Sequence, residues 1–455
     1  MKKLFALLMA LTMTVQLVTP AWADAVEEGP EESTEAVEVV QETTEATEET
    51  EVPEETEAET EETEATEEVT EPEETTEETA EAEPTEETEE ALPEAGVVED
   101  VAALEAGVVA SGTCGENLSW VLGDDGVLTV SGQGRMPNYS TSSVAPWYSK
   151  RTKITSVVVE PGVTTVGDYA FYACLKLAEV ALPEGMTDIG WGAFQDCTKL
   201  KAVEIPEGVT RIQSGAFYNC TGLESVTLPD GLKSIGNYND GAFQGCTSLK
   251  SIVIPDSVTS LGQYAFSGCS SLTSVHIGEG VTSIQYQTFS GCGSLVSVNI
   301  PESVTSIGQE AFSGCRSLLS LSIPDSVGRI GERAFQGCSS LTSVNIPDGV
   351  TRIEYETFYG CSNLESVVMP ESVTSIGEQA FDGCKSLSSV SIPEGVTSIG
   401  GSAFSGCSGL TSVSIGEGVL SIGSYAFSGC SGLTGITIPE GVTGIGSYAF
   451  PAAAA

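Results

Sequence analysis

The sequence predicts a mostly β solenoid, in which short coils of chain stack along one axis. Three observations predict it. A unit of 23 residues, seen most clearly from Leu410 to Gly432, recurs over about two thirds of the chain. Each unit has apolar residues at the intervals of short, one-sided strands, and each is too short to bury a core alone. The first 107 residues have neither feature. The solenoid is therefore expected to begin after them.

Every unit opens with an aliphatic residue. Thirteen copies open at Ile154, Leu177, Leu200, Leu223, Leu249, Leu272, Leu295, Leu318, Leu341, Leu364, Leu387, Leu410 and Leu433, the last one incomplete. A stack of coils grows by adding units and needs no new core. The solenoid is therefore predicted to occupy residues 154–455 as one domain.

Residues 1–23 have the pattern of a secretory signal peptide. Lys2 and Lys3 precede an apolar run from Leu4 to Val18, and small residues flank Trp22 at a cleavage site. The run is short for a membrane span, which leaves an uncleaved anchor as the alternative. The pattern predicts a secreted or cell-surface protein that starts at Asp24 and has no membrane insertion after signal cleavage.

Residues 24–107 are rich in Glu, Thr, Ala and Pro. Between Asp24 and Glu105 lie 36 of the 66 acidic residues and no Lys or Arg. Such a segment cannot bury enough apolar surface to become ordered, and we expect a disordered stalk or a solubilising tail. The remainder has 30 acids and 15 bases, with no basic cluster, so its charge argues against nucleic acid and anionic membranes as partners.

Residues 108–153 are predicted to cap the stack. Two β-type runs, residues 117–122 and 127–130, are joined by a Gly-Asp-Asp-Gly turn, which is typical of a hairpin. Trp147 adds a large apolar group just before the first coil. A solenoid end exposes strand edges and an open core, so an atypical terminal unit is expected there.

The coil of residues 295–317 shows the predicted construction. Leu295, Val298 and Ile300 alternate with polar residues, as in a strand with one buried face. A Pro-Glu-Ser turn follows, then a second short strand that ends at Ile307. Residues 309–315 are expected to form a helical or 3₁₀ turn that buries Ala, Phe and Cys.

Stacking in register converts each position of the unit into a row along the solenoid. One row consists of Cys174, Cys197, Cys220, Cys246, Cys269, Cys292, Cys315, Cys338, Cys361, Cys384, Cys407 and Cys430. Parallel Cβ directions disfavour disulfides between neighbours, and no CxxC pair supports a metal site. We interpret the row as buried thiols, with disulfides or metal ligation as the alternative.

A second row is acidic: Glu184, Glu207, Asp230, Asp256, Glu279, Glu302, Asp325, Asp348, Glu371, Glu394, Glu417 and Glu440. Each residue fits an exposed turn after proline. Calcium bridging between coils is the alternative, because neighbouring carboxylates repel. We interpret the row as exposed turn residues, and the sequence predicts no metal and no cofactor.

The outward strand positions are the weak candidates for recognition. One row is almost entirely serine; the variable row beside it contains Glu204, Thr227, Val253, His276, Asn299, Ser322, Asn345 and Val368. A varied strip on a background of small residues suits binding, although drift without selection gives the same pattern. His276 has no recognisable nucleophile beside it, and open parallel rows do not converge as a catalytic pocket requires. The sequence thus predicts no catalytic residue and no enzyme.

Several tyrosines occur near the corners of the coils: Tyr264, Tyr286, Tyr355, Tyr425 and Tyr448. Partial packing at the corner is the expected role, and stacking on sugars or peptides is the alternative.

Two departures from the repeat also stand out. Residues 237–241 lengthen one coil by three residues, which predicts a small protruding loop, and the chain stops near Phe450, which suggests a truncated end.

The pattern Leu-x-x-Val-x-Ile-Pro followed by Ile-Gly-x-x-Ala-Phe-x-x-Cys resembles the BspA-like leucine-rich repeats of secreted and surface proteins. It extends from Ile154 to Phe450, and the segment from Gly112 to Trp147 looks like the one that often precedes such repeats. The resemblance implies a right-handed leucine-rich-repeat solenoid, with adhesion or binding of host matrix as its usual role. We therefore expect an adhesin or receptor for extracellular protein or glycan; the alternative is a structural spacer of the cell envelope without a specific ligand.

Overall fold

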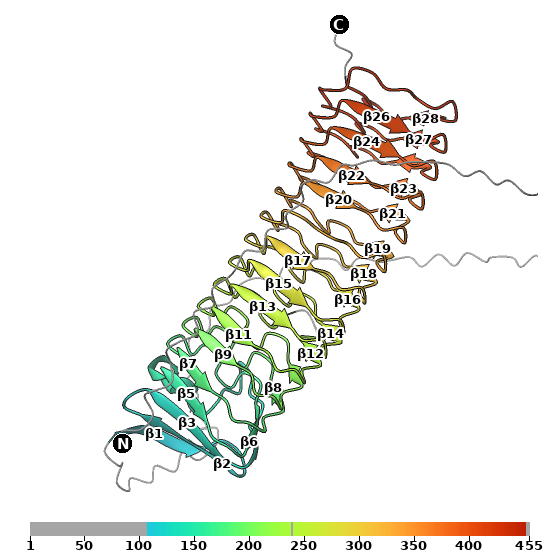
Figure 1. The fold of residues 1–455 in the computed structure, drawn as a ribbon. Helices are drawn as coiled ribbons and strands as arrows, with labels where there is room; N and C mark the ends of the chain where they lie inside the picture. Colours follow the sequence, from blue (N-terminus) through green and yellow to red (C-terminus); the bar gives the residue numbers. More distant parts are fainter. Residues whose placement is uncertain (1–106, 238–239, 452–455) are drawn as a thin grey trace, which may run out of the picture. The chain divides into compact units, whose positions relative to one another are not determined.

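The computed structural model describes residues 107–237 and 240–451 of the chain. The predicted signal peptide and the predicted stalk up to residue 106 lie outside the described residues, so both stay predictions. The described residues belong to one compact unit. It is a stack of coils with β1 (Val108–Thr113) near one end and β28 (Gly444–Ile445) near the other (Figure 1). The predicted mostly β solenoid is confirmed.

Most coils begin with a short strand that has one buried face. In β17 (Ser297–Asn299), Val298 is buried while Ser297 and Asn299 are exposed. Within each of several short sheets, the strands of successive coils pair in parallel, and each residue lies opposite its equivalent in the next coil, as Val275 does opposite Val298. The other first strands are β5 (Ser156–Val159), β7 (Glu179–Ala181), β9 (Ala202–Glu204), β11 (Ser225–Thr227), β13 (Ser251–Ile254), β15 (Ser274–Ile277), β20 (Ser343–Asn345), β22 (Ser366–Val368), β24 (Ser389–Ile392) and β26 (Ser412–Ile415).

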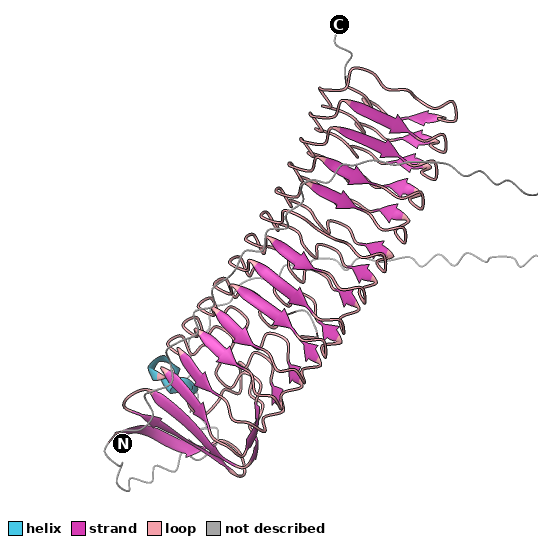
Figure 2. Ribbon diagram, viewed as in Figure 1, coloured by secondary structure: helices cyan, strands magenta, loops and turns pink. Residues whose placement is uncertain are grey.

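A turn and a second, shorter strand follow the first strand. The N–H of Val304 donates to the carbonyl of Pro301 at 3.0 Å and closes the predicted proline turn. Figure 2 shows the resulting pair of strands in most coils. The second strands are β6 (Val163–Val166), β8 (Asp188–Ile189), β10 (Arg211–Ile212), β12 (Ser234–Ile235), β14 (Ser260–Leu261), β16 (Ser283–Ile284), β18 (Ser306–Ile307), β19 (Arg329–Ile330), β21 (Arg352–Ile353), β23 (Ser375–Ile376), β25 (Ser398–Ile399), β27 (Ser421–Ile422) and β28.

The third side of each coil differs from the expected helical or 3₁₀ turn. Over residues 309–315, the N–H groups of Glu310, Phe312 and Gly314 donate to carbonyls of the next coil at 2.7–2.9 Å, and the intervening N–H groups close local turns. Glu310 and Gly314 have left-handed backbones, with φ of 56° and 73°. A helix needs right-handed φ at every residue and directs its N–H groups along its own axis. Within the described residues, the one helical element is the 3₁₀ helix η1 (Tyr148–Lys153), which precedes the first coil.

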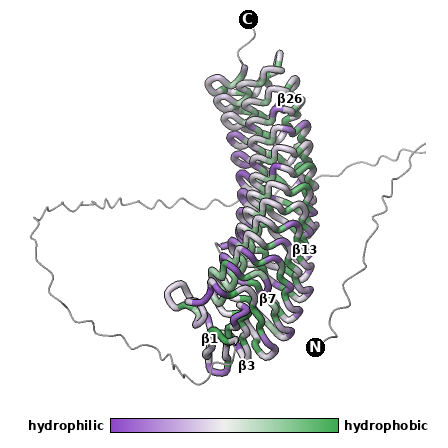
Figure 3. Tube along the Cα trace, turned by 90° about the vertical axis from the view of Figure 1, so that its left-hand side faces the viewer, coloured by the Kyte–Doolittle hydropathy of each residue, from purple (hydrophilic) through white to green (hydrophobic). Residues whose placement is uncertain are grey.

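An aromatic column runs through the core. It consists of Trp147 and, in order, Phe171, Phe194, Phe217, Phe243, Phe266, Phe289, Phe312, Phe335, Phe358, Phe381, Phe404, Phe427 and Phe450, with neighbouring ring centroids 5.1–5.8 Å apart and ring planes within 20°. Hydrophobic and hydrophilic segments recur from coil to coil around this core (Figure 3). Each ring is covered by its neighbours, so the core is continuous only because the coils stack.

The cysteine row is buried beside the aromatic column. All thirteen cysteines of the chain are buried free thiols, as predicted. In eleven coils the thiol donates to the Phe carbonyl of the preceding coil at 3.1–3.4 Å. The same carbonyl accepts the backbone N–H of the cysteine in its own coil, as Phe289 does from Cys292 at 3.2 Å. Each of these eleven thiols therefore links two coils.

The cap extends the sheet of first strands beyond the first coil. Strands β1, β2 (Leu118–Gly123) and β3 (Val127–Gly132) pair antiparallel, and β3 pairs in parallel with β5. The hairpin turn falls where the sequence predicted it, whereas β1 was not foreseen. Trp147 stacks on Phe171 at 5.6 Å and donates its indole N–H to the carbonyl of Ala170 at 2.8 Å. Trp147 of the cap thus takes the place in the aromatic column that a Phe takes in each coil.

The lengthened coil leaves the core undisturbed. The rings of Phe217 and Phe243 lie 5.1 Å apart although 26 residues separate them. The N–H of Phe217 still donates to the carbonyl of Ala242 at 2.8 Å. Tyr238 and Asn239 lie outside the described residues. The core stacking is therefore unchanged across this coil, and the predicted protruding loop, which falls in part outside the described residues, stays a prediction.

Candidate functional site

The variable row lies on the exposed face of the first strands. All eight of its residues are exposed. The strand register aligns Glu204 with Thr227, Val253 with His276 and Asn299, and Asn345 with Val368. Ser322 lies in the coil that opens at Leu318, where no first strand is assigned. The structure therefore brings the predicted residues into one row, with breaks in regular pairing between Thr227 and Val253 and at Ser322.

Asn299 differs from the other members of the row because its side chain is already bonded. Its amide oxygen accepts the N–H of Ile277 at 3.1 Å, and its amide nitrogen donates to the carbonyl of Ile277 at 3.3 Å. These bonds continue the strand pairing toward the preceding coil. Asn345, the equivalent residue two coils on, has no side-chain hydrogen bond among the described residues. Asn299 thus has a structural role that the sequence did not reveal.

Apolar side chains are conspicuous on the face of the first strands. Val253 is 63% exposed and Val368 is 59% exposed. Val296 and Leu319 add exposed aliphatic groups at the beginning of their coils. Exposed aliphatic groups of this kind are common components of contact surfaces.

An exposed charge ladder crosses the same face near the cap. Glu224 accepts from Lys250 at 2.6 Å and from Lys201 at 3.1 Å, across three successive coils. The hydrogen bond from Lys250, followed by that from Lys201, lowers the pKa of Glu224. Because all three groups are largely in solvent, the ladder contributes little to stability. It gives this end of the face a polar, charged character.

The corner tyrosines pack in part, as expected. Tyr264 and Tyr286 make an edge-to-face pair at 5.1 Å, and Tyr425 stacks on Tyr448 at 5.3 Å. The Arg333 guanidinium lies over the ring of Tyr355 at 4.8 Å. Tyr425 and Tyr448 remain 46% and 73% exposed.

Two acidic-row carboxylates also bond to the backbone of the next coil. The N–H of Glu279 donates to Asp256 at 3.0 Å, and the N–H of Glu417 donates to Glu394 at 2.9 Å. Both bonds connect equivalent turns. In the part of the chain that the structure describes, no group of three His, Cys, Asp or Glu residues is arranged to hold a metal ion.

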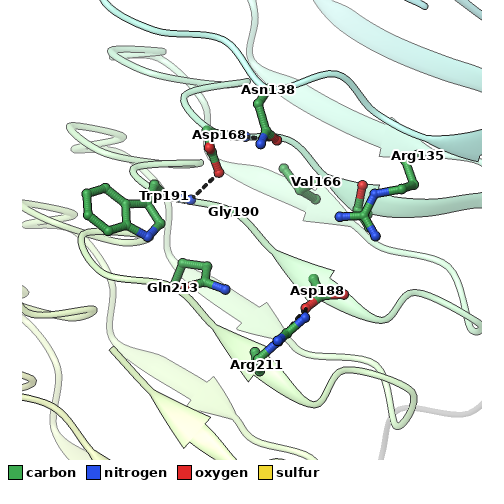
Figure 4. A pocket seen from close by; sticks show the side chains of 10 residues that line it. Arg135, Asn138, Val166, Asp168, Asp188, Gly190, Trp191, Arg211 and Gln213 are labelled. Atoms are coloured by element: carbon green, nitrogen blue, oxygen red, sulfur yellow. Dashed lines mark hydrogen bonds and ion pairs between the residues drawn. The ribbon is translucent and has the colours of Figure 1, made fainter. Parts of the chain in front are cut away.

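The sequence did not single out the face of the second strands, yet two clefts lie there. The first, the Trp191 cleft, has a volume of about 240 Å³. It is bounded by Arg135, Asn138, Asp168, Asp188, Arg211 and Gln213 together with Trp191 (Figure 4). Arg135 and Asn138 come from the cap, where β4 (Gly134–Arg135) pairs with β6. The other residues come from the first three coils.

Hydrogen bonds fix the walls of the Trp191 cleft. Arg211 binds Asp188 through two nitrogens, at 2.8 and 2.9 Å. Asp168 accepts the backbone N–H of Trp191 at 2.8 Å, and its own N–H donates to Asn138 at 3.1 Å. Trp191 is 38% exposed. The cleft therefore combines a fixed polar frame with an accessible aromatic side chain.

The second, the Tyr286 cleft, has a volume of about 490 Å³ and lies farther along the same face. Its polar lining comes from Gln263, Gln285, Gln309, Arg329 and Glu332, with Tyr286 as the aromatic group. A signal for both clefts was present in the sequence. At the second position after the second strand, most coils have a small or polar residue, whereas three of them have Trp191, Tyr286 and Tyr355.

A comparison with protein-family models identifies the repeats. The model of the BspA type leucine rich repeat region matches residues 147–239, 238–365 and 351–453. The chain belongs to this family. The match to this BspA-type protein begins at Trp147, the first member of the aromatic column. A search of curated proteins finds no match.

Solved bacterial structures resemble this BspA-type protein. A leucine-rich repeat protein from Eubacterium ventriosum is 27% identical, with a TM-score of 0.50 over 76% of this chain and 96% of that one. One from Bacteroides ovatus is 29% identical, with a TM-score of 0.43 over 74% and 96%. A leucine rich cell surface protein from Faecalibacterium prausnitzii is 27% identical, with a TM-score of 0.39 over 67% and 94%.

No helix within residues 107–237 and 240–451 has the length and apolar character to span a bilayer.

Proposed function

We propose that this chain is an exported surface or secreted protein that binds an extracellular protein or glycan through the variable row. The observation that carries the proposal is the geometry of the row. Side chains of different size, charge and polarity stand exposed at fixed spacing on a rigid sheet, beside a row of serines that leaves them accessible. A preformed surface of this kind binds without an ordering cost in its backbone.

Two further observations support the proposal. The predicted signal peptide directs the chain out of the cell, and the exposed Val253 and Val368, the third and the last residue of the row, supply apolar area. We propose binding and not catalysis, because the side chains of the row stand side by side and do not converge on a common point.

The experiment is an array of matrix proteins and glycans probed with the full-length exported chain. We expect saturable binding to at least one ligand class, and we expect Val253→Asp to weaken it at least tenfold. Ser386→Asp is the matched control, because it adds the same charge at an exposed position outside the row. Absence of binding to every ligand on the array, or an equal loss of affinity in both variants, contradicts the proposal and favours the structural spacer.

A further inference from the structure

The Trp191 and Tyr286 clefts share one design. Each has an aromatic side chain at the second position after a second strand, following Ile189 in β8 and Ile284 in β16. The position is the same in both coils, so stacking in register places both aromatic groups on the same face. Four coil steps of about 4.8 Å separate them, which is about 19 Å along the axis. The two clefts are therefore repeated elements of one strip.

The charges lining each cleft are balanced. The Trp191 cleft has two arginines, Arg135 and Arg211, and two aspartates, Asp168 and Asp188. The Tyr286 cleft has one of each sign, Arg329 and Glu332. A site for nucleic acid or another polyanion needs a net positive lining. These clefts suit a ligand without net charge.

Several polar groups at the clefts have no partner in the chain. Arg135 makes no ion pair or side-chain hydrogen bond among the described residues, and the same holds for the side chains of Gln263, Gln309, Arg329 and Glu332. All five are at least partly exposed. Arginine and amide groups offer several donors in fixed planar geometry, and amide and carboxylate oxygens accept. The clefts thus present donors and acceptors at close range, as a polyhydroxylated ligand requires.

An aromatic ring among such groups adds a flat apolar surface. Trp and Tyr offer a large ring face together with one polar atom. A pyranose ring has the complementary chemistry, with C–H groups on a face and hydroxyl groups around its edge. A purely apolar ligand would leave the arginines and amides unsatisfied, which is costly. A neutral saccharide satisfies both the ring and the polar groups.

We propose that the second-strand face is a binding site for neutral oligosaccharides, with Trp191 and Tyr286 as two stacking platforms. The Trp191 cleft, at about 240 Å³, is below the size of about 300–1,000 Å³ that is typical of sites for drug-sized ligands, and it takes a single sugar ring. The Tyr286 cleft is larger. An oligosaccharide long enough to contact both clefts gains from linked binding, so affinity rises with chain length. This site lies on a different face from the variable row and does not depend on it.

The test uses the full-length chain and neutral oligosaccharides of hexoses, pentoses and N-acetylhexosamines, from disaccharide to octasaccharide. Calorimetry gives the affinity. The difference in tryptophan fluorescence between the chain and Trp191→Phe reports on Trp191, because Trp22, Trp120 and Trp147 are present in both. We expect binding that strengthens with length, a fluorescence change that Trp191→Phe removes, and at least a tenfold loss of affinity in Trp191→Ala. Tyr286→Ala is expected to weaken binding of the octasaccharide, which contacts both clefts, more than binding of the disaccharide at the Trp191 cleft.

Three controls keep the result interpretable. Tyr286→Phe retains the ring and is expected to retain binding, while thermal melts check that each variant folds. Val253→Asp, which tests the variable row, is expected to leave this binding unchanged, so the two proposals fail or succeed separately. Absence of binding to every neutral oligosaccharide overturns the inference, as does unchanged binding in the Trp191→Ala/Tyr286→Ala double variant. Preference for an acidic saccharide or a peptide contradicts it equally.

Discussion

The thiol of Cys315 donates to the carbonyl oxygen of Phe289 in the preceding coil at 3.3 Å. That oxygen already accepts the N–H of Cys292 at 3.2 Å, so one carbonyl connects two coils. A buried alanine at this position would fill space without donating. The recurrence of cysteine in the row therefore has a physical reason beyond its size.

Replacing Cys315 with alanine is expected to destabilise the solenoid by about 1–2 kcal/mol, from one lost hydrogen bond and lost burial of sulfur. The measurement is the free energy of unfolding in urea. Cys174→Ala is the matched control, because Cys174 is equally buried but makes no such bond within the described residues. Equal losses in the two variants would show that the thiol bond contributes nothing.

The buried thiols also predict loss of stability in alkali. Burial raises the pKa of Cys292 and Cys361 from 9.0 to about 12. The folded chain therefore keeps these protons when the unfolded chain loses them, so the stabilising effect is complete below about pH 9 and falls between pH 9 and 12. In that window, each such thiol lowers the free energy of unfolding by about 1.4 kcal/mol per pH unit.

The check is the unfolding free energy of the chain measured from pH 7 to 11 under reducing conditions. Lysines and tyrosines titrate in the same range, so the comparison is with the Cys292→Ala/Cys361→Ala variant. Its stability at pH 7 is lower, and its further decline with pH is expected to be shallower. A parallel decline in both proteins contradicts the assignment to these thiols.

A charge placed in the middle of the stack is expected to divide the solenoid. Ile307 in β18 is 1% exposed, and its equivalents Ile284 and Ile330 pair on either side. Ile307→Asp buries an unpaired carboxylate, which costs at least about 3 kcal/mol. The neighbouring substitution Ser306→Asp adds the same charge at a partly exposed position and serves as the control. Calorimetry should show one unfolding transition in the control. In Ile307→Asp it should show two transitions, or one transition at a much lower temperature.

Much of this fold could be predicted because the repeat fixes it. Once the period is known, every Phe of the aromatic column and every Cys of the thiol row is assigned to the core by position alone. The period does not reveal backbone handedness. Glu310 adopts a left-handed φ of 56° although its side chain favours helix, so the expected helical turn over residues 309–315 is a series of turns bonded to the next coil.

The candidate surfaces also include features that the repeat predicts and features that it does not. The register that aligns Val253 with His276 follows from the repeat. The Trp191 cleft does not, because Arg135 and Asn138 reach it from a cap that has no repeat. Whether a side chain such as Asn299 is free or bonded depends on distances of a few tenths of an ångström, and a sequence pattern does not contain them.

Asn299 and Asn345 provide the last prediction, because they are the same residue at equivalent positions with different surroundings. Asn299 makes two hydrogen bonds to the backbone of Ile277, so Asn299→Ala is expected to lower the unfolding free energy by about 1 kcal/mol. Asn345→Ala is expected to change it by less than about 0.5 kcal/mol, as for other exposed positions. If the variable row binds a ligand, Asn345→Ala weakens binding without this loss of stability. Denaturation and binding measured on the same two variants distinguish the roles, and equal destabilisation of both would contradict the bonds that set Asn299 apart.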